Sequence, residues 1–156
     1  MTTRNKVLFL LLLALPALLP AQAASTAEVI ENLLNTEAVT NQQAAWLVLE
    51  AANISPARGI TSEAAAFRYA AEQGWLPRNA APAEPAALNG VSLLIMNAFE
   101  IRGGIFFSLF RGPHHAYREL QYLRIIQGRT APGMAVSGDT LLFMVNRTLS
   151  LFGDEQ

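Results

Sequence analysis

The sequence predicts an all-α protein in which two to three helical-hairpin repeats pack as one compact, pseudo-symmetric bundle. Two observations lead to this prediction. Apolar residues recur at the three- and four-residue spacing of buried helix faces, and one helix–loop–helix plan occurs more than once. The plan is clearest in residues 116–149, where a helix begins after Pro113, a Gly/Pro loop follows, and Ser137 is placed to cap a second helix that ends at Gly153.

Constant offsets between similar segments indicate the repeat. Ala66-Phe67-Arg68 matches Ala116-Tyr117-Arg118 and Trp75-Leu76 matches Ile125-Ile126, both at an offset of 50 residues, while Leu94-Ile95-Met96 matches Leu142-Phe143-Met144 at 48. A weaker third copy precedes these, because Leu49 lies 47 residues before Met96. The alternative is that any two amphipathic helices joined by a Gly/Pro loop would align as well. The expected units span about residues 25–60, 61–112 and 113–153.

Residues 1–23 have the pattern of a signal peptide. Arg4 and Lys6 precede an apolar run over 7–19, and Ala21-Gln22-Ala23 has the small-x-small form of a cleavage site. The rival interpretation is an uncleaved anchor, but 13 residues are fewer than the roughly 20 that span a bilayer. We therefore expect an exported protein, periplasmic or on the cell surface, with no transmembrane span after cleavage. Residues 24–156 would form a single helical domain.

The composition of residues 24–156 limits the classes of partner that this domain is expected to bind. Nine arginines stand against 12 acidic residues, with no lysine and no basic run, so nucleic acid and anionic membrane surfaces are poor candidates. The chain has no cysteine, which excludes both a disulfide framework and a lipid-modified cysteine. A domain of this length can bury its own core without such covalent links.

The first two helices of this domain have capping signals. Ser25-Thr26-Ala27-Glu28 has the S-x-x-E arrangement of a capping box and predicts a helix that ends near Asn35. Thr40-Asn41-Gln42-Gln43 repeats the arrangement and predicts a helix that ends near Asn53. Pro56 and Gly59 then indicate a turn over residues 54–60.

The middle of the chain continues in the same way. Thr61 or Ser62 would cap a helix that runs to about Gln73, with Gly74 in the left-handed terminal conformation. Residues 78–85 read as a long loop because they contain two prolines. From Ala86 or Ala87 to Phe99 the sequence is hydrophobic nearly all round, which predicts a helix at the centre of the domain.

The segment Ile105–Phe110 is the most hydrophobic part of the chain after the signal sequence. It could cover the core as a short helix or an extended lid. Alternatively, it could form an exposed apolar lip that meets a membrane or a partner protein, in which case Phe106, Phe107 and Phe110 are the candidate contacts.

The three-unit plan resembles the S-layer homology module of exported bacterial envelope proteins. The local matches are Ile125-Ile126-Gln127-Gly128, Pro132, Val136-Ser137 and Asn146-Arg147 in the last unit, and Gly74-Trp75-Leu76-Pro77 in the middle one. The resemblance covers most of residues 24–156. It implies three helical hairpins around a pseudo-threefold axis, with grooves between units that bind cell-wall polymer.

The family's binding signature is an Ile-Thr-Arg-Ala-Glu-like element at the start of each second helix. The matching segments are Val39-Thr40-Asn41-Gln42-Gln43, Pro85-Ala86-Ala87-Leu88-Asn89 and Val136-Ser137-Gly138-Asp139-Thr140. The cap hydroxyl is present in two of them, and the arginine in none. A groove for an acidic polymer needs that bidentate cation, so the resemblance supports the fold more than the activity.

The densest polar cluster follows the apolar segment and contains Arg111, His114, Tyr117 and Arg118. We do not expect a metal site, because adjacent histidines point about 100° apart on a helix and no cysteine is present. A solvated helix start explains the cluster. A binding surface is the alternative, because Arg68 and Arg118 occupy equivalent repeat positions beside aromatic residues, an arrangement that suits sugar or carboxylate recognition. Trp75 belongs to the same set of candidate ligand-binding residues.

No catalytic motif is found: the sequence lacks G-x-S-x-G, H-E-x-x-H and a phosphate-binding glycine loop. We therefore expect neither an enzyme nor a cofactor. The predicted function is a non-catalytic envelope-binding or anchoring module that contacts cell-wall polymer or an envelope protein. The alternative is a structural subunit, such as that of a homo-oligomer, that assembles through the apolar surface Ile105–Phe110.

Overall fold

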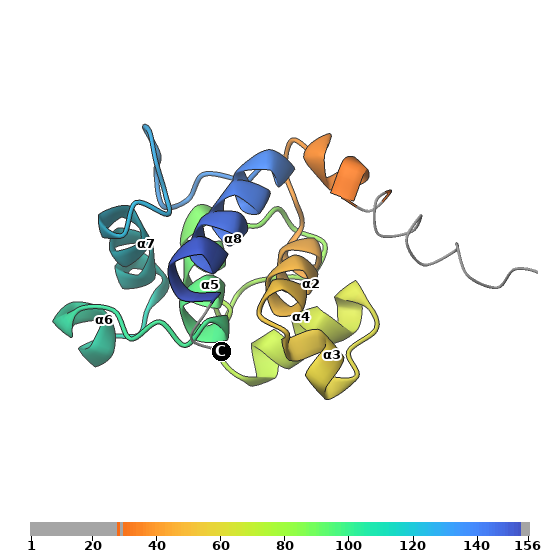
Figure 1. Ribbon diagram of the computed structural model, residues 1–156, viewed down its shortest axis with the longest axis horizontal. Helices are drawn as coiled ribbons and strands as arrows, with labels where there is room; N and C mark the ends of the chain where they lie inside the picture. Colours follow the sequence, from red (N-terminus) through yellow and green to blue (C-terminus); the bar gives the residue numbers. More distant parts are fainter. Residues whose placement is uncertain (1–27, 29, 154–156) are drawn as a thin grey trace, which may run out of the picture. The chain divides into compact units, whose positions relative to one another are not determined.

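The computed structural model describes residues 28 and 30–153, and every regular element in these residues is a helix (Figure 1). The predicted all-α class is confirmed. The chain divides into two units, Met1–Asn32 and Leu33–Gln156. In the first unit, residues 28 and 30–32 are helical and exposed. The expected signal peptide and the first three residues of the Ser25 capping box lie outside the described residues.

The second unit contains the helices labelled in Figure 1. They are α2 (Asn41–Ala51), α3 (Ile54–Arg58), α4 (Glu63–Glu72), α5 (Leu88–Ala98), α6 (Ile105–Leu109), α7 (Pro113–Tyr122) and α8 (Gly138–Phe152). Among them, no helix is both long and apolar enough to cross a membrane, and the same holds for the rest of the described chain.

Most helix boundaries follow the local signals. Thr40 and Gln43 form the predicted capping box of α2, in which the Gln43 amide donates to Thr40 Oγ1 at 3.3 Å. Ser62 caps α4 in a similar way. One segment departs from the prediction: residues 54–60 contain the five-residue helix α3. Pro56 is compatible with it because the amides of a first helical turn have no intrahelical partner.

The close packing of helices crosses the predicted repeat boundaries. Helix α4 packs on α2 and α7 packs on α5, while α2 also contacts α5 and α8. The first helix of one expected unit therefore packs on the second helix of the unit before it. Helices of different expected units can pair in this way because a loop of about 15 residues separates α4 from α5, and another separates α7 from α8. Such loops can reach beyond a neighbouring helix.

Three segments that precede α2, α5 and α8 are joined in a closed ring of backbone hydrogen bonds. The Val39 amide donates to the Val136 carbonyl at 2.8 Å, the Val136 amide to the Ala86 carbonyl at 3.0 Å, and the Ala86 amide to the Val39 carbonyl at 2.8 Å. All three residues are buried. Each segment donates to one neighbour and accepts from the other, so the three expected repeats make equivalent contacts here.

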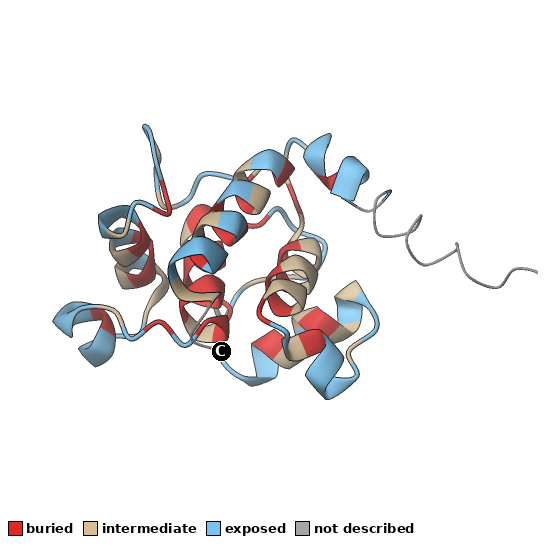
Figure 2. Cartoon of the chain, viewed as in Figure 1, coloured by how far each residue is buried: buried red, intermediate tan, exposed pale blue. Residues whose placement is uncertain are grey.

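Helix α5 lies in the hydrophobic core, as its sequence predicts. Nine of its eleven residues are buried. Figure 2 shows buried residues along α5 and on parts of α2 and α8, whereas α6 is mostly exposed. The C-terminal ends of α2 and α5 lie away from the ring, and residues at both ends line the cleft described next.

Candidate functional site

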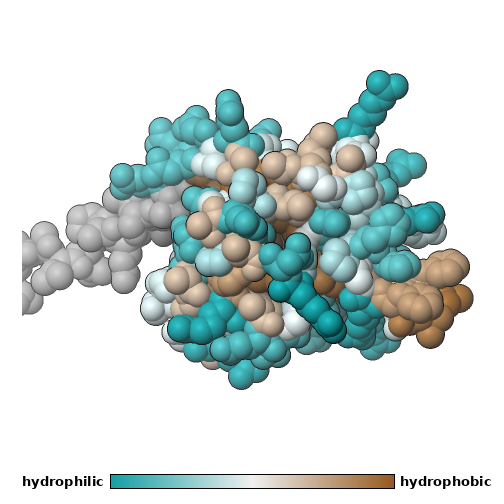
Figure 3. Space-filling view, turned by 180° about the vertical axis from the view of Figure 1, so that it is seen from behind, coloured by the Kyte–Doolittle hydropathy of each residue, from teal (hydrophilic) through white to brown (hydrophobic). Residues whose placement is uncertain are grey.

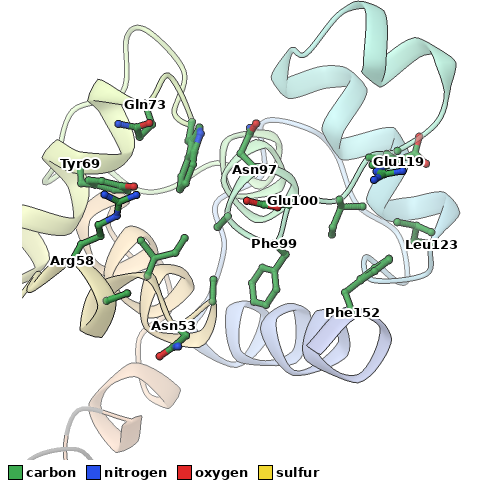
Figure 4. A pocket seen from close by; sticks show the side chains of 18 of the residues that line it. Asn53, Arg58, Tyr69, Gln73, Asn97, Phe99, Glu100, Glu119, Leu123 and Phe152 are labelled. Carbon is green, nitrogen blue, oxygen red and sulfur yellow. The ribbon is translucent and has the colours of Figure 1, made fainter. Parts of the chain in front are cut away.

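The larger cleft, which we call the aromatic cleft, has a volume of about 1280 Å³. It is bordered by α3 and α4, by the C-terminal end of α5 with residues 99–104, by α7, and by Phe152 of α8. Figure 4 shows these elements around the opening. The polar or aromatic side chains in its lining are Asn53, Arg58, Tyr69, Gln73, Trp75, Asn97, Phe99, Glu100, Arg102, Glu119, Tyr122 and Phe152.

A pair of aromatic rings forms part of the wall of this cleft. The Tyr69 and Trp75 rings meet edge to face, with centroids 5.7 Å apart and planes at 85°. The end of α4 positions Trp75. Gly74 adopts the left-handed conformation at φ 71°, and the Trp75 amide donates back to the Ala70 carbonyl at 2.9 Å. This Schellman-type end fixes the direction in which the chain leaves the helix.

Two residues in the cleft lining have strained backbones. Asn53 follows the C-cap of α2 with φ 55°, and Glu100 follows the C-cap of α5 with φ 51°. The left-handed conformation costs a non-glycine residue roughly 1–2 kcal/mol, although Asn tolerates it better than Glu. Figure 4 shows Glu100 below Asn97. Arg124 has the same conformation after the C-cap of α7 and lines neither cleft, so positive φ here is a feature of helix ends as well as of the cleft.

The charged groups of the cleft are two arginines and two carboxylates. Figure 4 shows Arg58 extending toward Tyr69 on one side, while Glu119 lies on the opposite side. The lining contains no serine, threonine, histidine, lysine or cysteine, so it lacks the nucleophile–base pairs of acyl-transfer and phosphoryl-transfer sites. The cleft offers aromatic faces, amide groups, guanidinium donors and two carboxylate acceptors. These groups suit a polar ligand with flat apolar faces.

A second cleft, of about 770 Å³, lies between the loop after α4 and the start of α7. Its charged residues are Arg78 and Arg111, and no carboxylate lines it. Its remaining lining is largely apolar and includes Phe67, Leu76 and Leu93. This cleft is more basic and smaller than the aromatic cleft.

The predicted ligand-binding residues are divided between these places. Trp75 lines the aromatic cleft and Arg111 lines the second cleft. Arg68, His114 and Arg118 are exposed and line neither. The structure therefore does not bring the six predicted residues together.

Tyr117 is buried and holds a loop in place. Its side chain is 5% exposed, and its hydroxyl donates to the Thr130 carbonyl at 2.9 Å. Gln121 Nε2 donates to the same hydroxyl oxygen at 2.8 Å. With both its donor and an acceptor position occupied, Tyr117 connects α7 to the loop that leads to α8.

The two histidines pack against aromatic rings. His114 and His115 meet edge to face at 5.8 Å, and His115 stacks on Phe110 at 5.6 Å. In the part of the chain that the structure describes, no group of three or more His, Cys, Asp or Glu residues is arranged to hold a metal ion.

The sequence prediction missed Tyr69, Asn97 and Glu100. No local motif marks them, because they come together only through the packing of α4 on α2 and of α2 on α5. One signal was present: the offset of 47 residues that aligns Leu49 with Met96 also aligns Asn53 with Glu100. Equivalent helix ends can meet when repeats pack around a common centre.

Comparison of the chain with models of known protein families, with curated proteins and with solved structures finds no match among any of them.

Proposed function

We propose that this chain is a non-catalytic binding module of the cell envelope that holds a saccharide segment of a cell-wall polymer in the aromatic cleft. The observation that carries the proposal is the Tyr69–Trp75 pair in a cleft that also contains amides and the Arg58 guanidinium. The C–H groups on a sugar face suit the negative face of an aromatic ring. Amide and guanidinium groups suit the hydroxyl and carboxylate substituents.

The size of the cleft supports a polymer over a small ligand. Its volume of about 1280 Å³ exceeds the roughly 300–1,000 Å³ typical of small-molecule sites. The expected export of the chain and its resemblance to S-layer homology modules agree with an envelope polymer as the ligand. The signature arginine is missing at the starts of α2, α5 and α8, which weakens the case for family-type binding there. The aromatic cleft lies at the opposite ends of α2 and α5, so the missing arginine does not affect it.

The test is co-sedimentation of the purified chain with purified peptidoglycan sacculi. We expect the chain to pellet and Arg58→Gln to reduce its retention by about tenfold, since a charge-assisted hydrogen bond is lost. Arg68→Gln and Arg118→Gln make the same charge change at exposed positions outside both clefts and serve as matched controls. The helical circular dichroism signal should be equal in all four proteins.

Two outcomes would contradict the proposal. If the chain does not pellet with sacculi at any protein concentration, the polymer is not its ligand. If Arg118→Gln abolishes retention while Arg58→Gln does not, the ligand binds at α7 and the aromatic cleft has no part in it.

A further inference from the structure

Four of the exposed large hydrophobic side chains of the described residues gather on α6 and the residue after it. Ile105 is 77% exposed, Phe106 72%, Leu109 69% and Phe110 59%. We call these four side chains the apolar prong. Figure 3 shows a strongly hydrophobic knob at one edge of the molecule, which corresponds to this segment. Monomeric proteins rarely expose so concentrated an apolar patch to water, and such patches commonly mark interaction sites.

Phe107 and Gly103 hold the prong in place. Phe107 points the other way, is 3% exposed and belongs to the core. Gly103, at φ 64°, lets the chain turn where a side chain would meet Met96 and Phe107 at about 3 Å. Phe107 therefore cannot present its ring to a partner as the sequence suggested. The structure combines both expectations, because one phenylalanine covers the core and two remain outside.

Three exposed arginines, which we call the collar, lie close to the prong in the sequence. Arg102 and Arg111 flank α6, Arg118 follows in α7, and all three are exposed. In the sequence no carboxylate occurs between Glu100 and Glu119, although the whole chain has a net charge of −1; the Glu119 carboxylate itself lies at the start of α6, 3.3 Å from the place of a Cβ on Gly104. The even composition that argued against anionic membranes thus contains a segment, residues 101–118, with three arginines and no carboxylate.

We propose that the apolar prong inserts into the interface of a lipid bilayer that contains anionic lipids, with the arginines of the collar on the phosphate groups. Interfacial elements bury their apolar face roughly 5–10 Å into the boundary of headgroups and acyl chains, and the four side chains of the prong provide such a face. Arginine pairs well with phosphate oxygens, so apolar insertion and charge pairing can occur together.

A second copy of the chain fits this surface less well. A standard protein interface uses about 20–30 residues from each partner, and the prong offers four large side chains. In a two-fold contact the same surface faces itself, so the arginines of both collars would come together and repel. A bilayer needs no matching shape and supplies the opposite charge.

The test uses a fluorophore that reports only on the prong. Because the chain contains no cysteine, Phe106→Cys can be labelled at a single site with an environment-sensitive nitrobenzoxadiazole dye. Glu72→Cys, at an exposed position of α4, is the matched control. With vesicles of phosphatidylglycerol and phosphatidylcholine, the emission at position 106 should shift to the blue and brighten, while the emission at position 72 should not change. Any binding through the N-terminal segment is common to both proteins.

Charge dependence gives a second readout. Adding Arg111→Gln to the labelled Phe106→Cys protein should raise the vesicle concentration at half-maximal shift about fivefold. Vesicles of phosphatidylcholine alone, or high salt, should weaken the response similarly. No blue shift at position 106, or an equal shift at both positions, would overturn the proposal. A shift that grows with protein concentration in the absence of vesicles would do the same and identify a second copy as the occupant.

Discussion

Gly138 is the first residue of α8, and its backbone lies directly against the carbonyl group of Leu33. A Cβ atom built at this position would overlap the carbonyl oxygen, so only glycine fits without a shift of the backbone. The Gly138 amide also donates to the Thr36 carbonyl at 2.9 Å, which fixes the approach of the two segments. This contact closes one of the three junctions around the backbone ring.

Gly138→Ala should therefore lower the free energy of unfolding by about 3 kcal/mol, since the backbone must move apart to admit the methyl group. Gly133→Ala is the control, because a Cβ there meets nothing within 4 Å, and we expect a change within about 0.5 kcal/mol. Urea denaturation of the two variants measures the difference. Equal free energies of unfolding in the two variants would show that the backbone at Gly138 can move away from Leu33 without destabilising the protein.

A second prediction at the residue scale concerns backbone strain. Glu100→Gly should raise the free energy of unfolding by about 1 kcal/mol, because glycine adopts positive φ without penalty. Arg124→Gly should do the same, since Arg124 has φ 56° at the matching end of α7. Only Glu100 lines the aromatic cleft, so retention on sacculi should fall in Glu100→Gly alone. Equal retention in both variants would mean that the strain at Glu100 serves no ligand.

At the scale of elements, a side-chain hydrogen bond caps the starts of α2 and α4, whereas α3, α5, α6, α7 and α8 begin without one. Thr40 accepts from the Gln43 amide, whereas Ser137 makes no hydrogen bond to the backbone of α8. The Ser137 hydroxyl instead bonds to the side chains of Asp139 and Thr140. The hydrogen bond from the Ser137 hydroxyl is the largest cause that holds the pKa of the Asp139 carboxyl below its ordinary value, and a hydrogen bond from the Thr140 backbone is the second.

Thr40→Ala should accordingly cost about 1 kcal/mol of stability, the usual loss when a capping side chain is removed. Ser137→Ala should cost less than half of this, because no helix amide loses a partner. Thermal unfolding followed by circular dichroism compares the two. A larger loss in Ser137→Ala would mean that the Ser137–Asp139 interaction, rather than backbone capping, stabilises the start of α8.

The bounds of α2, α4, α5 and α8 and the start of α7 could be predicted because capping residues, glycines, prolines and apolar periodicity act over a few neighbouring positions, whereas α7 ends at Tyr122, several residues before the Gly128 that was expected to break it. The pairing of the helices could not. Both faces of α5 are apolar, so its sequence fits a neighbour on any side. Which helix covers it depends on the path of the loops and on the fit of the facing side chains.

At the scale of the whole molecule, the ring formed by Val39, Ala86 and Val136 links segments that lie about 50 residues apart. Each residue in the ring is both a donor and an acceptor, so opening one junction exposes buried backbone groups at the other two. The three expected repeats should therefore unfold as one cooperative body.

Hydrogen exchange measured by NMR tests this cooperativity. The amides of Val39, Ala86 and Val136 should exchange at rates within about tenfold of one another once intrinsic rates are corrected for, with the protection of global unfolding. The Phe110 amide, bonded to the Phe106 carbonyl on the exposed α6, should exchange much faster and serves as the reference for local opening. Widely different protection among the three ring amides would indicate repeats that open independently.

The sequence by itself determined the helical class, the places where most helices begin and end, the central position of α5, and the candidate repeat with its offset of about 50 residues. These follow from local chemistry and from periodicity along the chain. Only the tertiary structure decided that α4 packs on α2, that Tyr69 and Trp75 share a cleft with Glu100, and that Phe107 is buried while Phe106 is exposed. Such contacts join residues far apart in the chain, and their energies depend on shape and burial that no local pattern encodes.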